Sequence, residues 1–260
     1  MLLHNFNLIP KYPFVVDSLL HGFDIGIPPI IHTRTPFNNL SLINHFDHFD
    51  AIIKREFLKQ RYIGPFSRTE IEEILGPFQT SPLSLVPKPN KPNAFRLVQN
   101  YSYPHTPSEN YSSINSHINA ADYPCTWGTF SAFARIILSL PPGSQGAVRD
   151  VSEAYRTVPV KPSQWPGMVV RLDNERDEFV IDTQAYFGGT ANGGVFGLVA
   201  DACADIMRAH GLGPISKWVD DHVFFRILRE HIAEYNKARQ KWKESITVTG
   251  GKHHNGGRIW

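Results

Sequence analysis

The sequence predicts an α+β fold in which antiparallel strand pairs are combined with amphipathic helices. Three observations indicate this class. Short apolar stretches come in pairs that are joined by turn-forming residues, which is typical of β-hairpins. Longer segments repeat apolar residues at three-to-four spacing, which is typical of helices. Apolar residues make up 42% of the 260-residue chain, enough for a buried core.

Length and composition narrow the class of protein. With 260 residues and a formal net charge of +2, we expect one large domain or two small, closely packed ones. No apolar run is long enough to cross a bilayer, and the N-terminus lacks the basic and apolar regions of a signal peptide. We therefore expect an intracellular protein without a membrane partner. The near-neutral charge by itself argues neither for nor against nucleic acid.

Cysteine and histidine give no sign of a metal or disulfide framework. Two thiols, Cys125 and Cys203, fit a reducing compartment but do not distinguish cytoplasm from nucleus. The close histidine pairs, His45-x-x-His48 and His253-His254, have no cysteine near them. Surface histidines are therefore a better interpretation than a zinc site.

The first 76 residues predict a helical extension. An irregular arm with one helical turn at residues 14–21 precedes an amphipathic helix at residues 41–61, where apolar side chains recur at helical spacing. Ser67 and Glu70 then form the pattern of a capping box, which opens a short helix through Leu75. Gly76-Pro77 ends that helix.

Residues 77–108 have a different character. They contain seven prolines and no acidic residue, but they carry Lys88, Lys91 and Arg96. The segment SLVPKPNKPNAFRLVQN predicts a strand, a basic turn and a second strand. A hairpin with cations and no acids suits contact with phosphates. From this segment alone, an ordinary solvated turn remains the alternative.

The remaining chain predicts alternating helices and strand pairs, with a basic helix last. The expected elements are a helix at 129–140, a strand ending at Asp150, a short helix at 151–155, paired strands at 167–172 and 178–183, the glycine-rich loop FGGTANGG leading into a helix that ends at Gly211, a strand pair on either side of 219–222, and a helix at 229–243.

Three carboxylates carry the chemical signal. Asp220 and Asp221 are adjacent in the apolar stretch WVDDHVFF, where like charges repel and lose water. Either a turn directs both into solvent, or a divalent cation neutralises them. Asp150 ends another apolar strand 70 residues earlier, and a site built from two strand ends suits two-metal phosphoryl transfer. Mg²⁺ is the expected ion because it prefers hard oxygen ligands.

The order and spacing of these motifs resemble the palm of reverse transcriptases: Asp150 with Ala154 and Tyr155, then Phe187-Gly188, then Asp220-Asp221. Upstream, Pro87-Lys88 and the segment FRLV resemble the fingers hairpin of that family. More narrowly, the chain resembles the polymerase of DIRS-type, tyrosine-recombinase retrotransposons. The phrases that carry this resemblance are DSLLHGFDIGI, YIGPF, SPLSLVPKPNKPNAFRLVQNYSYP, SINSHI, DVSEAYRTVPV and GGRIW.

The resemblance implies roles for individual residues. Asp150, Asp220 and Asp221 match the catalytic carboxylates that bind two Mg²⁺, with Mn²⁺ as a possible substitute, and Val151 matches the residue whose main-chain carbonyl joins them. Tyr155 matches the ring that excludes a ribose 2′-hydroxyl; without the family context, a core aromatic is an equal reading.

The remaining implied roles concern the nucleotide and the nucleic acid. Lys88 and Arg96 match cations that bind the incoming triphosphate. Gly188 and Gly189 match a loop at the nascent base pair, for which an ordinary tight turn is the alternative. Phe187 and Trp218 match positions beside the template and the primer. Because no Gly-Lys-Ser/Thr follows the glycines, the loop is not a P-loop.

Four departures from the family pattern bear on activity. Trp218 stands where the family usually has Tyr or Phe, and its bulk is expected to crowd the primer terminus. Asn100 replaces a common Asp. Extra glycine at 193–194 is expected to loosen the loop that contacts the template base. The sequence given ends at Trp260, about where the primer grip and thumb of the family are expected to begin.

Together these features predict a right-hand polymerase fold with an antiparallel palm sheet backed by helices. The expected parts are an N-terminal helical extension (1–76), a fingers-like region (77–145) and a palm-like region (146–260) without a thumb. The expected activity is RNA-directed DNA polymerase, a nucleotidyltransferase that acts on a primed RNA or DNA template and dNTP, with other retroelement polypeptides as possible partners. The alternative is a degenerate retroelement fragment that keeps the fold and binds nucleic acid without catalysis. Tyr155 disfavours an RNA-directed RNA polymerase.

Overall fold

The computed structural model describes residues 2–248, with side chains through residue 241, so the closing segment GGRIW lies outside the described residues. The chain forms two compact units, each built from separate stretches of sequence. Among the described residues, the first contains 2–15, 124–154 and 196–248. The second contains residues 16–123 and 155–195. The predicted fingers and palm boundaries are contiguous ranges and stay a prediction.

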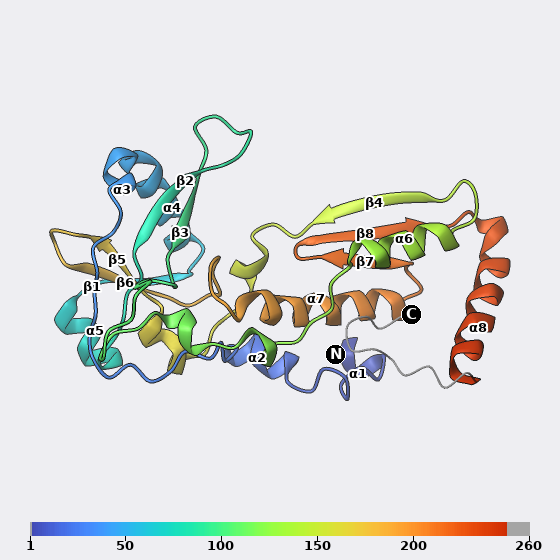
Figure 1. Cartoon of the computed structure of the whole chain (residues 1–260), viewed down its shortest axis with the longest axis horizontal. Coiled ribbons are helices and arrows are strands. Elements are labelled where there is room, and N and C mark those ends of the chain that lie inside the picture. Colours follow the sequence, from blue (N-terminus) through green and yellow to red (C-terminus); the bar gives the residue numbers. More distant parts are fainter. Residues whose placement is uncertain (1, 249–260) are drawn as a thin grey trace. The chain divides into compact units, whose positions relative to one another are not determined.

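The first unit contains a three-stranded antiparallel sheet of order β4-β8-β7 (Figure 1). Its strands are β4 (Gln145–Asp150), β7 (Ile215–Trp218) and β8 (Asp221–Arg226). The helices are α1 (Leu2–Asn5), α6 (Phe130–Ser139), α7 (Asn192–Ala209), η5 (Arg229–His231) and α8 (Ile232–Val248), of which α7 enters this unit at Phe196. Two contacts join α7 to β7: Arg208 donates to the Ile215 carbonyl at 2.9 Å, and Lys217 lies 3.2 Å from Asp201.

The N-terminal arm packs against α7. Leu3, Tyr12 and Val15 form a buried cluster with Ala202 of that helix. The Tyr12 hydroxyl donates to Asp205 at 2.6 Å, and Lys11 also donates to the same carboxylate. Apolar burial and hydrogen bonds therefore both fix this arm to the helix.

The second unit contains two antiparallel sheets, one of order β1-β6-β5 and one hairpin of β2 and β3. The strands are β1 (Tyr62–Ser67), β2 (Leu83–Pro87), β3 (Phe95–Gln99), β5 (Val169–Asp173) and β6 (Glu178–Asp182). The helices are α2 (Val15–His21), α3 (Ser41–Asn44), α4 (Phe46–Leu58), α5 (Arg68–Leu75) and the short η1 (Ile114–His117), η2 (Ala120–Asp122), η3 (Ala154–Thr157) and η4 (Pro162–Gly167).

The β1-β6-β5 sheet is buried on both faces. Successive side chains of a strand point to opposite faces, so Phe179 packs with Ile71 of α5, whereas Val180 packs with Phe49 and Ile53 of α4. None of these five side chains exposes more than 8% of its surface. Helices on both sides of the sheet thus enclose the core of this unit.

Most of the predicted elements are confirmed. Ser67 caps α5 in a capping box with Glu70, and Thr129 caps α6. The predicted helix at 41–61 is divided at His45, whose backbone is not helical. Strand β1 was not predicted. It contains Gly64-Pro65, a pair that is more typical of a turn, and a register shift between Ile63 and Phe66 accommodates the proline.

The expectation for the glycine-rich loop is wrong in its second half. Helix α7 begins at Asn192, so Gly193 and Gly194 lie in its first turn and do not loosen the preceding loop. A Cβ at Gly194 would lie 2.0 Å from the carbonyl oxygen of Tyr123, so glycine permits this close approach. The short helix expected at 151–155 begins three residues later, as η3.

None of the helices in residues 2–248 combines the length and the apolar character that crossing a bilayer requires.

Candidate active site

The ends of strands β4 and β8 bring the predicted carboxylates onto neighbouring backbone positions. Asp150 and Asp221 are direct register partners in the antiparallel pair. The ladder continues one step further, because the Val151 amide donates to the Asp220 carbonyl at 2.9 Å. Directly opposed residues in such a pair have Cβ atoms about 5 Å apart. Asp150 is exposed, and Asp220 and Asp221 are half-buried.

The β7–β8 hairpin has a strained tip. Trp218 and Asp221 are paired, which leaves Val219 and Asp220 as a two-residue turn. Val219 has a φ of +50°, a left-handed conformation that is rare for a β-branched residue and costs about 1–3 kcal/mol. Such a strained conformation persists only where the surrounding structure imposes it. Here the paired strands on either side of the turn hold the backbone next to Asp220. The side chain of Trp218 is 51% exposed and its ring lies 6.1 Å from that of Trp127.

The opposite face of the hairpin is buried and carries a lysine that the sequence reasoning missed. Lys217 donates to the Thr126 carbonyl at 2.7 Å, lies 3.2 Å from Asp201 and sits over the Trp127 ring. Its register partner His222 is also buried, and burial lowers the pKa of this imidazole, with the charge of Lys217 acting in the same direction. The position of Lys217 in the apolar strand ISKW was the sequence signal that could have revealed this buried lysine.

The donor set suits magnesium in kind but is not assembled as a metal site. The carboxylates of the three aspartates and the main-chain carbonyl of Val151 are the hard oxygen donors that Mg²⁺ prefers. Within residues 2–248, however, no three Asp, Glu, His or Cys side chains are gathered closely enough to hold an ion. The strand pairing therefore aligns the backbone of the aspartates, but their three carboxylates do not form an ion-binding group.

The predicted phosphate-binding cations lie on the β2–β3 hairpin of the second unit. Arg96 is the register partner of Val86, and the Lys88 amide closes the turn by donating to the Ala94 carbonyl at 2.8 Å. Arg96 is exposed and Lys88 half-exposed, and neither has an ion-pair partner among the described residues. Both cations therefore remain available for an anionic ligand.

The predicted sugar-contacting ring and the glycine loop are neighbours within the same unit. The rings of Tyr155 and Phe187 meet edge to face, with centroids 4.9 Å apart and an interplanar angle of 63°. The side chain of Asn115 anchors the loop that follows Phe187. Its Nδ2 donates to the Gly188 carbonyl at 2.8 Å, and its Oδ1 accepts from the Thr190 main-chain amide at 3.0 Å. Gly188 has a φ of +104°, which favours glycine at this position.

Each unit thus contains one part of the predicted site. The first unit carries Asp150, Val151, Trp218, Asp220 and Asp221, and the second carries Lys88, Arg96, Tyr155, Phe187, Gly188 and Gly189. Asn115 is an addition that sequence reasoning did not assign, although it lies in the phrase SINSHI that contributed to the resemblance.

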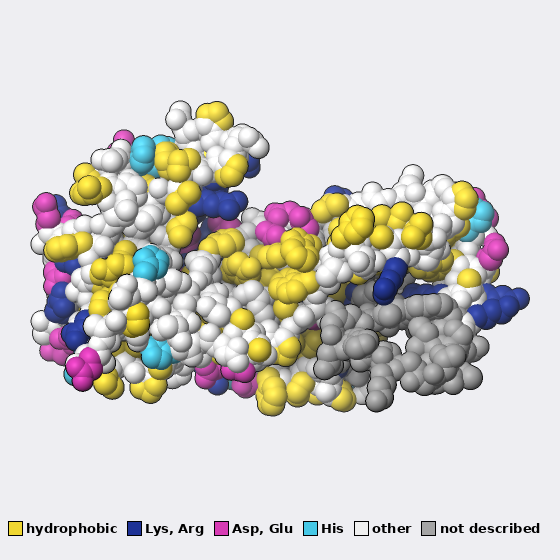
Figure 2. Space-filling view, in the orientation of Figure 1, with side chains coloured by type: hydrophobic (Ala, Val, Ile, Leu, Met, Phe, Trp, Pro, Cys, Tyr) yellow, Lys and Arg dark blue, Asp and Glu magenta, His cyan; other side chains and the backbone are white. Residues whose placement is uncertain are grey.

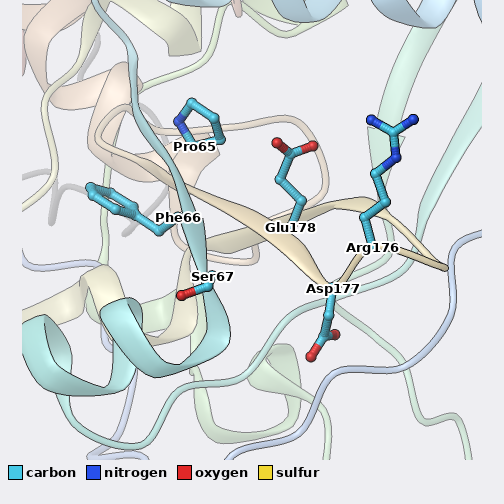
Figure 3. Close-up of a pocket in the computed structure, with 6 residues that line it drawn as sticks. All are labelled: Pro65, Phe66, Ser67, Arg176, Asp177 and Glu178. Atoms are coloured by element: carbon cyan, nitrogen blue, oxygen red, sulfur yellow. The ribbon is translucent and has the colours of Figure 1, made fainter.

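Two hollows lie away from these residues. One of about 230 Å³ is formed by the register shift of β1 and the turn before β6, where Arg176 and Glu178 point to one side and Asp177 to the other (Figure 3). Asp177 is already paired with Arg68 and Arg171, which hold its pKa below the ordinary value. The second is an open apolar groove between α6 and β8, and Figure 2 shows apolar side chains over α6.

Comparison with solved structures finds foamy virus protease–reverse transcriptases. The native prototype foamy virus enzyme matches with a TM-score of 0.50 at 16% identity, over 85% of this chain and 24% of the solved chain. A foamy viral enzyme in complex with an RNA/DNA hybrid matches with a TM-score of 0.52 at 15% identity, over 93% of this chain and 28% of the solved chain. No family model and no curated protein sequence matches the chain.

These likenesses show a fold of mixed helices and antiparallel sheets that is similar to reverse transcriptase. The chain spans about a quarter of the length of the solved chains that it matches.

Proposed function

We propose that this chain is the fingers–palm portion of an RNA-directed DNA polymerase of the DIRS-type retrotransposon family. The observation that carries the proposal is the register pairing of Asp150 with Asp221, beside the strained turn that presents Asp220. This arrangement occurs in a fold that is similar to reverse transcriptase. The right-hand arrangement, with residues 146–260 as palm and 77–145 as fingers, is part of the proposal.

The proposed chemistry is transfer of a nucleotide from a dNTP to a primer 3′-hydroxyl. Asp150, Asp220, Asp221 and the Val151 carbonyl would hold two Mg²⁺ ions, with Mn²⁺ as a substitute. When bound, such ions neutralise the triphosphate and lower the pKa of the attacking hydroxyl. The protein's own part is positioning, which can lower a barrier by several kcal/mol without covalent chemistry.

The proposed nucleotide contacts come from the residues that match the family pattern. Lys88 and Arg96 bind the triphosphate through charge-assisted hydrogen bonds, and the guanidinium can donate to two oxygens at once. The ring of Tyr155 lies under the sugar and excludes a 2′-hydroxyl. Gly188 and Gly189 allow the backbone to approach the nascent base pair. The partners are a primed RNA or DNA template and, in its natural setting, other retroelement polypeptides.

A nucleic-acid-binding domain without catalysis is the second candidate. It is favoured by the carboxylates, which are not gathered as a metal site among the described residues, and by Trp218 at a position next to the primer. The basic β2–β3 hairpin would then account for binding, and the three aspartates would only be part of the strand ends and of the turn between β7 and β8.

Primer extension on an RNA template with Mg²⁺ separates the two candidates. We expect the wild-type chain to add a deoxynucleotide, and Asp220→Ala to reduce the rate by about 100-fold or more, because it removes an ion ligand. Glu230→Gln, which removes one negative charge from the exposed η5, is the matched control and should leave the rate unchanged. Template binding without extension would favour the second candidate, and equal extension by wild type and Asp220→Ala would overturn the proposal.

A further inference from the structure

Arg156, next to Tyr155 in the chain, lies in a buried cluster of charges within the second unit. One guanidinium nitrogen donates to both carboxylate oxygens of Asp182, at 2.9 and 2.7 Å, and the other donates to Glu56 at 2.9 Å. The three side chains are 11%, 2% and 8% exposed, respectively. The cluster brings helix α4, the end of strand β6 and the segment after Tyr155 to one point.

The same guanidinium also contacts the backbone that leads to Phe187. The nitrogen that faces Asp182 also lies 3.2 Å from the carbonyl oxygens of both Gln184 and Ala185, so its two N–H groups are shared among these acceptors. Asp182 accepts from the Gln184 amide at 3.1 Å, so both members of the ion pair bind this segment. One residue therefore adjoins Tyr155 in sequence and fixes the segment that carries its ring partner.

This buried cluster of charges is better explained by its effect on local geometry than by a gain in the free energy of unfolding. Burial disfavours the charge of Arg156, but the surrounding groups, Asp182 foremost and Glu56 among them, together outweigh this and keep the pKa of Arg156 above its ordinary value. Apolar residues of the same volume are often as stable as a buried ion pair, or more stable. One terminal nitrogen faces Asp182 and the two carbonyls, and the other faces Glu56. A planar guanidinium that spans these acceptors specifies an arrangement that the single ammonium of a lysine cannot reproduce.

We propose that Arg156 is a positioning residue that holds the Tyr155 ring against Phe187 and thereby sets the discrimination between deoxyribonucleotides and ribonucleotides. This inference rests on the proposed function. It adds a determinant that touches neither the nucleotide nor the ions. Asp182 and Glu56 serve as its anchors.

The test compares Arg156→Lys with Arg171→Lys in the full chain. Arg171 is a matched control, because it is buried in the same unit and donates to the Thr35 and Asn174 carbonyls and to Asp177, at the far turn of β5. Two readouts are measured for each variant: the ratio of kcat/KM for dATP over ATP in primer extension, and amide hydrogen exchange of the peptides that cover 154–158 and 183–190.

We expect Arg156→Lys to lower the dATP/ATP ratio by about tenfold or more, since a misplacement of about 1 Å can cost about 100-fold. Exchange should rise in 154–158 and 183–190 and stay unchanged in β5. Arg171→Lys should leave the ratio unchanged, even if it destabilises the fold equally. Asp182→Asn, which keeps the carboxylate's volume, should reproduce the Arg156→Lys effects. It replaces Arg156→Lys in the test if that variant does not fold.

In primer extension, either of two results would overturn the inference while leaving the proposed function intact: an unchanged dATP/ATP ratio in active Arg156→Lys, or an equal fall in Arg171→Lys. An equal rise in amide hydrogen exchange across all peptides of Arg156→Lys would mean that Arg156 stabilises the fold in general, and this result would also contradict the inference. A wild-type chain that extends no primer would count against the proposed function, and the exchange pattern would then decide whether Arg156 positions the two segments.

Discussion

Replacing Gly194 with alanine should destabilise the protein strongly, whereas the same change at the adjacent Gly193 should not. The Cβ of an alanine at 194 would lie 2.0 Å from the Tyr123 carbonyl oxygen and 2.5 Å from its Cβ. At position 193, the nearest atom is the Tyr155 hydroxyl at 3.9 Å, an ordinary contact distance. The two glycines lie in the same first turn of α7, so they differ mainly in this packing.

The expected magnitudes follow from the two contacts. At position 194, backbone atoms must move by about 1 Å or more, and overpacking of this kind costs about 1–3 kcal/mol. Alanine is favoured over glycine in a helix by about 0.5–1 kcal/mol. This gain offsets only part of the cost at 194, but it is the whole effect at 193. The free energies of unfolding should therefore differ by about 2 kcal/mol, with the wild type between the two variants.

Equilibrium unfolding in urea, followed by circular dichroism, measures this difference. With a slope of about 1–3 kcal/mol per M, the midpoints of the two variants should be separated by about 1 M. Equal midpoints, or a less stable Gly193→Ala, would refute the reasoning. Such a result would mean that the glycines belong to a loose loop rather than to a helix packed on residue 123.

Two further predictions concern stability. Burial tends to raise the pKa of Asp205, but hydrogen bonds from Lys11, Tyr12 and Arg208 outweigh it and hold this pKa below its ordinary value. The ionised carboxylate therefore stabilises the fold at neutral pH, and this stabilisation is lost as the pH falls below about 4. Asp205→Asn should lower the free energy of unfolding, measured in urea, by about 1 kcal/mol at pH 7 and by less at pH 3. An equal decrease at both pH values would contradict this. Ser67→Ala should lower the free energy of unfolding by about 1 kcal/mol through loss of the α5 cap, and an unchanged urea midpoint would count against the cap.

Local signals made the strand ends and caps predictable. Asp150 closes a short strand, and Asp220 and Asp221 lie at a hairpin, because apolar patterning and turn residues specify these positions within a few residues. The cap at Ser67 followed from spacing alone.

Other features depend on packing between distant segments, which a single sequence does not reveal. Nothing local shows that Gly194 faces Tyr123 or that Asn115 binds the loop at 188–190. The partners of Arg156 are 26 and 100 residues away in the chain, so its role was invisible before the fold was known. Strand β1 was missed because its Gly-Pro pair lies in a register shift, where the usual turn signal does not apply.

We propose that three aspartates on paired strand ends form a two-ion site, and counting the bound ions is the most direct test of it. Electron paramagnetic resonance can measure free Mn²⁺ in a titration of the full chain with primed RNA template and a non-extendable dNTP analogue. A two-ion site predicts two Mn²⁺ per wild-type chain and weaker binding, by about 100-fold for at least one ion, in Asp150→Asn and in Asp220→Asn. The same number and affinity of ions in wild type and both variants would contradict it.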